Sequence, residues 1–198
     1  LYPLNFTDVD AELKKITAEL SDPGKVALAG VKAADIIRKH LYEGEGFEPL
    51  GQVTKDYRGD SKGRPLLDTG HLRDSFTAEL VNKETVSVGT TVKYAPIQNN
   101  GGVITAKKEW LFIPGPRMRY YERKFGRKPG DVLNGLRSEG FWVYRAGRAV
   151  FYREKEKGSK AHVAYYLKKS VEIPKREFFY LTDEELNQIT EEVADEII

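Results

Sequence analysis

The stretch "RPLLDTGHLRDSF", residues 64–76, contains the residue types that nucleophilic catalysis requires. His71 and Ser75 are four residues apart, so on a helix they would share one face. A neighbouring carboxylate such as Asp68 could orient the imidazole of a serine–histidine pair. However, neither a nucleophile elbow nor an oxyanion loop accompanies the stretch. We therefore do not expect catalytic residues here.

A structural interpretation of the same stretch is simpler. Asp68 or Thr69 is placed to cap a helix that begins near Gly70. Leu72 and Phe76 would then lie four residues apart on the face that docks on the core. The sequence accordingly predicts a structural helix start, and the protein is not expected to be an enzyme.

The composition offers few residues that could bind a metal or a cofactor. The chain has no cysteine, which excludes disulfides, thiolate zinc sites and cysteine nucleophiles. Its three histidines, His40, His71 and His162, are far apart and lack ligand spacing. No glycine-rich loop has the form of a phosphate-binding loop. Neither a metal nor a cofactor is expected.

The net charge of +2 conceals two segments of opposite charge. Residues 107–128 contain eight lysines and arginines against two glutamates, a net charge of +6. Residues 182–198 contain seven acids and no basic residue. Such a chain suits head-to-tail self-association or a charged partner. No run approaches the roughly 18 apolar residues of a membrane span, so no membrane contact is expected.

Hydrophobic periodicity predicts helices over residues 7–20, from Asp22 to about residue 43, and over 182–197. Asp22 and Pro23 are a typical N-cap and first helical position. The apolar stripe of the second helix has small residues at its centre, so another part of the chain can approach closely there; it comprises Val26, Gly30, Ala33, Ile37 and Leu41. Thr182 and Glu185 fit a capping box at the start of the last helix.

Between these helices the sequence predicts antiparallel strands. One hairpin turns at residues 82–84 and another at residues 146–147, and a third strand follows at 162–173. Residues 47–64 are interpreted as a loop, and residues 107–140 as an extended excursion that is mostly irregular from 114 onward. The expected fold is α+β in one domain over 1–198, with N-terminal helices, an antiparallel sheet of hairpins and a C-terminal helix.

Five short motifs occur in order: "FEPLGQVT", "RPLLDTGHLRDSF", the two parts of "VSVGTTVKYAPIQNNGG", and "IPKREFFYLTDEELNQI". Together they resemble the phage virion morphogenesis family of the Mu-like type, also called tail completion proteins. The matching covers roughly residues 47–102 and 167–198. The motif positions are Leu67, Thr69, Gly70, Leu72, Gly89, Tyr94, Gln98, Pro174, Arg176 and Phe178.

The resemblance implies a non-enzymatic structural protein of a tailed phage or prophage. Such a protein completes the tail or joins it to the head, as part of a ring at the neck, with six-fold symmetry implied by the family. Its partners would be copies of itself and neighbouring connector and tail proteins, with possible non-specific contact to passing DNA. Its place would be the virion, and the host cytoplasm during assembly.

The opposed charges suggest which residues would meet across a subunit interface. The basic candidates are Arg117, Arg119 and Arg123, with the aromatic anchors Tyr121 and Phe125. The acidic candidates are Glu184, Glu185, Glu192 and Glu196. The alternative function is a nucleic-acid-binding module, because residues 107–128 interleave cations with aromatic residues as single-strand binders do.

Overall fold

The computed structural model describes residues 22–59, 63–156 and 158–195. The chain divides into two compact units. Unit 1 comprises Leu1–Glu48, Arg64–Gly102 and Pro174–Ile198, and unit 2 comprises Pro49–Gly63 and Val103–Ile173. The prediction of a single domain stays a prediction, because this division does not say whether the units fold together. The predicted helix at residues 7–20 lies outside the described residues.

Unit 1 is built around helix α2, Pro23–Glu43. The Asp22 side chain accepts a hydrogen bond from the Gly24 amide at 2.7 Å, and Gly44 ends the helix in the left-handed conformation. The predicted stripe is buried along its whole length. At its centre a Cβ on Gly30 would lie 2.2 Å from Val86 Cγ2, so the glycine leaves room for the Val86 side chain of a neighbouring hairpin.

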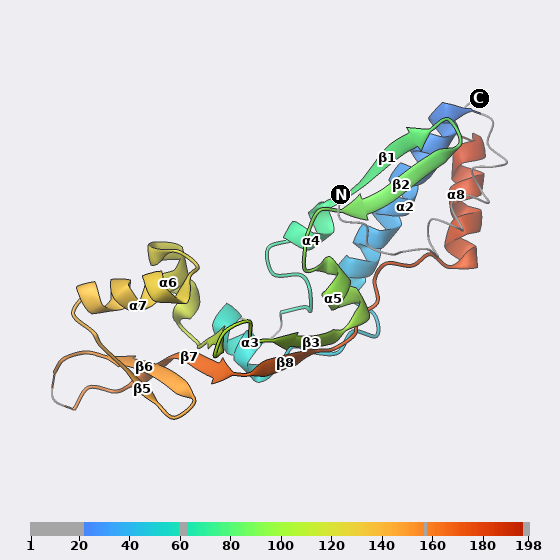
Figure 1. The fold of residues 1–198 in the computed structure, drawn as a ribbon. Helices are drawn as coiled ribbons and strands as arrows, with labels where there is room; N and C mark the ends of the chain where they lie inside the picture. The colour runs from blue at the N-terminus through green and yellow to red at the C-terminus, as the bar shows by residue number, and fades with distance from the viewer. Residues whose placement is uncertain (1–21, 60–62, 157, 196–198) are drawn as a thin grey trace. The chain divides into compact units, whose positions relative to one another are not determined.

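That hairpin consists of strands β1, Phe76–Asn82, and β2, Thr85–Thr90, paired antiparallel. Figure 1 shows it beside α2, with helix α8, Asp183–Asp195, also lying along α2. The short helices α4, His71–Asp74, and α5, Ala95–Asn100, complete the unit. Its core is apolar and drawn from all three chain segments; it includes Ile37, Leu41, Leu72, Phe76, Val88, Phe178, Ile189 and Val193.

The predicted capping box of α8 is confirmed. Glu185 Oε2 accepts a hydrogen bond from the Thr182 amide at 2.8 Å. Thr182 Oγ1 accepts one from the Glu185 amide at 3.3 Å. Two backbone donors at the helix start are therefore satisfied by side chains only three residues apart in the sequence.

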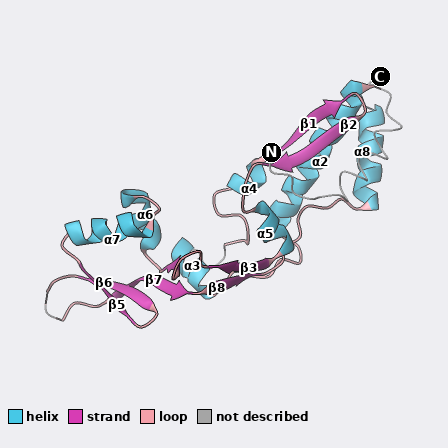
Figure 2. Cartoon of the chain, viewed as in Figure 1, coloured by secondary structure: helices cyan, strands magenta, loops and turns pink. Residues whose placement is uncertain are grey.

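Unit 2 contains a four-stranded antiparallel sheet in the order β4-β7-β6-β5. Helices α6 and α7 cover one side of this sheet (Figures 1 and 2). Two further strands, β3 and β8, pair separately, and β3 begins at Gly102, at the edge of unit 1. The strands are β3 Gly102–Thr105, β4 Leu111–Pro114, β5 Trp142–Ala146, β6 Ala149–Arg153, β7 His162–Lys168 and β8 Ser170–Ile173.

The prediction that residues 114–140 are mostly irregular is wrong. Helix α6 spans Met118–Phe125 and helix α7 spans Pro129–Ser138. Gly135, whose helix-breaking tendency argues against α7, lies where a Cβ would be 2.3 Å from the Phe125 ring. The glycine therefore admits an aromatic ring between the two helices, and the packing offsets its low helix propensity.

The chain also forms helix α3, Gln52–Arg58, inside the segment predicted to be a loop. Its sequence, QVTKDYR, has no apolar stripe, and accordingly none of its residues is buried. The α+β class is confirmed, with a helix near the start of the described chain, a C-terminal helix and antiparallel hairpins between them. Among the described residues no helix is long and apolar enough to cross a membrane.

Candidate functional site

The stretch at residues 64–76 forms a helix start, but its cap differs from the prediction. Gly70 is the N-cap, held at φ 80°, a left-handed conformation that favours glycine. Thr69 Oγ1 accepts a hydrogen bond from the His71 amide at 3.4 Å, so it supports the helix from one position earlier. Leu72 is buried, as predicted, whereas Phe76 is buried as the first residue of β1 and not as part of the helix.

Ser75 is tied to the backbone and to strand β2. Its hydroxyl donates to the Leu72 carbonyl at 2.7 Å and lies 2.6 Å from Thr90 Oγ1. Thr90 Oγ1 in turn accepts a hydrogen bond from the Val92 amide at 3.1 Å. His71 is exposed, and no hydrogen bond joins it to Ser75 among the described residues. The arrangement fastens α4 to the hairpin.

The ten named motif positions lie in unit 1, although they come from separate chain segments. Gly70, Leu72, Arg176 and Phe178 are buried, and Tyr94 is exposed. Thr69 is exposed as well, while Leu67, Gly89, Gln98 and Pro174 are half-buried. Most of the first motif, residues 49–54, and Ile173 of the last motif lie in unit 2, so the motifs extend over both units.

Arg176 links three stretches of unit 1. Its amide donates to the Gln98 carbonyl at 3.0 Å, and its Nη1 donates to Gln98 Oε1 at 3.4 Å. Its Nε donates to the Glu48 carbonyl at 3.0 Å. The side chain is only 8% exposed, so these bonds compensate the desolvation of a charged group. Arg176 therefore holds these three stretches together inside unit 1.

Asn99 holds the chain between Pro174 and α8. Its Oδ1 accepts hydrogen bonds from the amides of Phe178, at 2.9 Å, and Phe179, at 3.0 Å. Its Nδ2 donates to Asn100 Oδ1 at 2.8 Å. Asn99 is 4% exposed, and the two amides that it pairs lie beside the largest apolar residues of the core. A single side chain thus satisfies two consecutive buried donors.

His40 connects α2 to the same segment. Its Nδ1 lies 3.2 Å from the Phe178 carbonyl, its Nε2 lies 2.6 Å from Glu185 Oε1, and its ring stacks on Tyr180 at 4.2 Å. Burial alone would raise the pKa of Glu185, but hydrogen bonds from Thr182 and His40 outweigh it, and this pKa lies below its ordinary value. Glu185 is therefore held as a carboxylate.

The acidic interface candidates are only partly available to a partner. Glu185 is engaged with His40, and Glu192 pairs with Lys32 at 2.9 Å and accepts a hydrogen bond from Gln188 at 2.7 Å. Glu184 is exposed on α8. Glu196 lies outside the described residues. Glu184 is thus the most accessible of the candidates that the structure describes.

The basic and aromatic candidates lie on or beside α6 in unit 2. Tyr121 packs against Tyr152 and Phe141 with ring centroids 5.5 and 6.3 Å apart, and Phe125 packs against Gly135. Both rings are half-buried in the packing of their own unit, so substitutions there would report on folding first.

The cations of this group are more accessible. Arg117 and Arg123 are exposed, and Arg119 is half-buried, with Nη1 3.5 Å from the Arg58 carbonyl. Arg117 Nη1 lies 3.3 Å from His162 Nε2. Burial and then the charge of Arg117 lower the pKa of His162.

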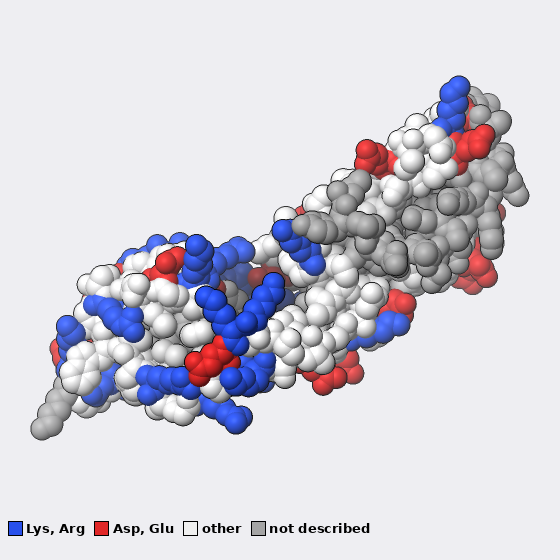
Figure 3. Space-filling model, viewed as in Figure 1, with Lys and Arg blue, Asp and Glu red and all other residues white. Residues whose placement is uncertain are grey.

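Charge divides between the units far more strongly than the two predicted segments suggest. The chain has 32 lysines and arginines and 30 acids. Unit 2 contains 20 of the lysines and arginines and 9 of the acids, so its formal charge is +11. The remaining 12 lysines and arginines and 21 acids give unit 1 a formal charge of −9. On the face that Figure 3 displays, lysines and arginines gather over the part of the chain that carries α6, α7 and β5–β7.

Sequence reasoning missed Asn99 and His40, and it missed the exposed aromatic residues of β5. Asn99 stands next to the motif residue Gln98, but its partners are about 80 positions away. His40 is a polar residue that is buried on α2, and a single histidine in a helix is a weak sequence signal of burial. Trp142 and Tyr144 alternate with Val143 along a strand, and this alternation was the available signal.

Searches for related proteins add no identification. The chain matches no protein-family model, no curated protein and no solved structure. The resemblance in the five motifs therefore stays a prediction.

Proposed function

We propose that the protein is a structural virion protein of a tailed phage or prophage, which completes the tail or joins it to the head within a ring at the neck. The virion role rests on the motif resemblance, and the opposite formal charges of the two units, −9 and +11, support a head-to-tail contact between copies. When one patch of a subunit meets a different patch on the next, the contact is heterologous, and heterologous contacts form rings when the rotation closes.

Charge complementarity between such patches would guide subunits into the correct order. Oppositely charged surfaces raise the encounter rate and suppress pairing of like surfaces. In this proposal the exposed cations of α6 meet the acidic surface of α8 on the next copy, with Arg123 and Glu184 as central residues. The same surfaces would contact connector and tail proteins.

The motif residues have a different role in this proposal. Arg176, Gln98 and Phe178 hold unit 1 together from inside, so they keep the acidic surface in shape and do not touch the partner. This agrees with a family pattern that is spread over several chain segments. The ring of six subunits remains a proposal that follows from the resemblance alone.

The proposal is tested with matched charge reversals in the full chain. One variant carries Arg123→Glu with Arg127→Glu, and the other carries Glu184→Lys with Glu191→Lys. Each variant alone should stay monomeric in sedimentation velocity, and their mixture should assemble, because both contacts become complementary again. Assembly of the wild type should weaken as salt increases. Wild-type assembly that neither reversal disturbs would contradict the head-to-tail contact.

The virion role needs its own test in the particle. Removing the gene from an inducible prophage should leave heads and tails unjoined or tails of abnormal length. A reconstruction of the complete particle should place the chain around the symmetry axis at the neck. Normal, infectious particles without the chain would overturn the virion role while leaving the charge-reversal result intact.

A further inference from the structure

The sheet of unit 2 has one covered side and one side that carries exposed aromatic residues. Val150 and Tyr152 of β6 are buried under Met118 and Leu136 of the two helices. The alternate positions of β6 and β5 face the other way. There Trp142 is 52% exposed and Tyr144 is 40% exposed.

The register of the hairpin places a cation beside this aromatic pair. Trp142 pairs with Arg153, and Tyr144 pairs with Phe151. The Arg153 guanidinium carbon lies 4.9 Å from the centre of the Trp142 ring, and the Tyr144 ring stacks on Phe151 at 5.7 Å. Stacking on these neighbours fixes the ring orientations, so the exposed faces are preorganised.

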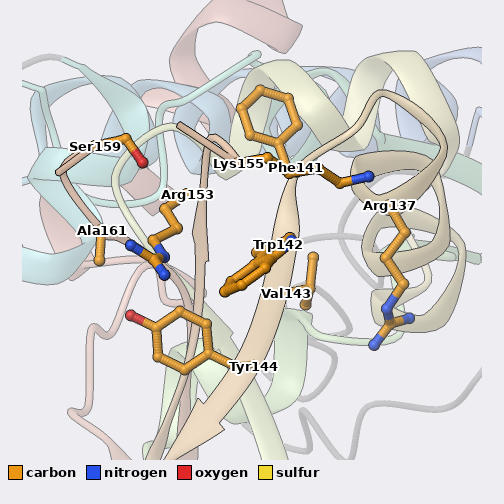
Figure 4. Close-up of a pocket in the computed structure, with 9 residues that line it drawn as sticks. All are labelled: Arg137, Phe141, Trp142, Val143, Tyr144, Arg153, Lys155, Ser159 and Ala161. Atoms are coloured by element: carbon orange, nitrogen blue, oxygen red, sulfur yellow. The ribbon is translucent and has the colours of Figure 1, made fainter. Parts of the chain in front are cut away.

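A hollow of about 830 Å³ lies along this edge of the sheet. Figure 4 shows Trp142, Tyr144 and Arg153 on one side of strand β5, with Val143 and Arg137 on the other. Lys155 adds a third cation to the lining, which holds no carboxylate among the described residues. The site thus combines flat aromatic faces with positive charge, in a unit whose formal charge is +11.

We propose that this surface binds single-stranded nucleic acid. A single strand presents phosphates for the cations of the lining, of which Arg153 lies on the aromatic side of β5, and unstacked base faces for Trp142 and Tyr144. A duplex hides its base faces in the stack, so it would use only the cations. An acidic peptide would likewise leave the exposed aromatic rings without a matching partner. The site differs from the 107–128 segment of the alternative function, whose Tyr121 and Phe125 are half-buried in unit 2.

The test measures anisotropy of a fluorescein-labelled oligothymidine of about 20 nucleotides with the full chain, at about 50 and about 200 mM NaCl. Trp142→Ala should weaken binding roughly 5- to 100-fold at both salt concentrations, because stacking on one base is lost. Arg153→Ala should weaken binding more at low salt and reduce the slope of log affinity against log salt by about 0.7. A duplex of equal length should bind with little dependence on Trp142.

Controls separate this site from its alternatives. Tyr120→Ala removes a 62% exposed tyrosine of the same unit, on α6, and should leave binding unchanged. Trp142→Phe keeps a stacking face and should retain most of the affinity, whereas Trp142→Leu should not; this pair decides the matter if Trp142→Ala fails to fold.

The proposal is overturned if Tyr120→Ala has the larger effect, if Trp142→Leu binds as the wild type does, or if a polyglutamate peptide competes as well as the oligonucleotide. The last outcome would assign the hollow to an acidic protein partner. None of these measurements depends on ring formation, so they can fail independently of the proposed function.

Discussion

The two units stabilise polar groups in different ways. Unit 1 buries Asn99, Arg176 and His40, and each has hydrogen-bond partners in a distant segment of that unit. Unit 2 buries tyrosines against apolar side chains of two helices, and burial raises the pKa of Tyr152 to about 12. Buried hydrogen-bonded networks fix one arrangement of the chain, whereas apolar packing tolerates only substitutions that conserve volume and shape. Unit 1 should therefore depend on single polar residues, and unit 2 on shape.

The strongest test of this difference is Asn99→Leu. The substitution removes the acceptor of two buried amides, and we expect a loss of about 2–5 kcal/mol in the free energy of unfolding. Hydrogen exchange should accelerate at the amides of Phe178 and Phe179 and elsewhere in unit 1.

Asn100→Leu is the matched control: it removes the acceptor of Asn99 Nδ2 but leaves the Phe178 and Phe179 amides paired, so it should cost only about 1 kcal/mol. Urea unfolding and exchange monitored by mass spectrometry measure both effects. Equal losses in the two variants would show that the hydrogen bonds of Asn99 contribute little. Equal acceleration of exchange in unit 2 would show that the two units are not distinct in stability.

The second test addresses shape in unit 2. Gly135→Ala places a methyl group against the Phe125 ring, and overpacking of this kind typically costs about 1–3 kcal/mol. Gly130→Ala, in the same helix, meets no atom within 4 Å and should be neutral or stabilising by up to about 1 kcal/mol. Thermal unfolding of both variants distinguishes packing from helix propensity. If both alanines stabilise the chain, Phe125 moves freely and the packing argument fails.

These two tests also mark the limit of prediction from sequence. The capping box at Thr182, the N-cap at Asp22 and the hairpin turns depend on residues close together in the chain, so the sequence predicted them. The sequence did not predict helix α7, because Gly135 disfavours a helix and the Phe125 ring that packs against this glycine lies on another helix. The cap of α4 was predicted in part: Thr69 Oγ1 accepts a hydrogen bond from the His71 amide, but the N-cap residue is Gly70 in a left-handed conformation, which no capping side chain indicates.

The candidate sites show the same division. The sequence indicated the motif residues, yet Asn99 and His40 acquire their roles only through partners in other segments of unit 1. It also indicated charge asymmetry, but the formal charges of −9 and +11 appear only after the chain is divided into units. The aromatic face of β5 could be assigned only once α6 and α7 were known to cover the other side of the sheet.

A third test concerns the carboxylate inside the network of unit 1. The pKa of Glu185 is lowered in the folded chain, so its stabilisation is present above its ordinary pKa of 4.5 and is lost as the pH falls through the lower folded value. Glu185→Gln should cost about 1–2 kcal/mol at pH 7 and distinctly less at about pH 3. Urea unfolding at the two pH values measures this difference. A difference that grows towards low pH would contradict the assigned hydrogen bonds.

The smallest effect distinguishes an acid that is engaged within unit 1 from one that is available to a partner. Glu192 accepts a hydrogen bond from Gln188 and pairs with Lys32, and these two contacts keep its pKa below the ordinary value. A surface pair of this kind contributes little to stability and is screened by salt. Glu184 is exposed on the same helix, so its charge is open to solvent and to an approaching subunit.

Glu184→Gln should therefore weaken self-association more than Glu192→Gln does, because the charge of Glu192 is already paired with that of Lys32. Glu192→Gln should instead lower stability slightly more, because it weakens the contact with Lys32. Sedimentation velocity and thermal unfolding of the two variants at equal ionic strength measure both quantities. If Glu192→Gln has the larger effect on association, Lys32 does not shield this acid, and the acidic surface of unit 1 extends from α8 across to α2.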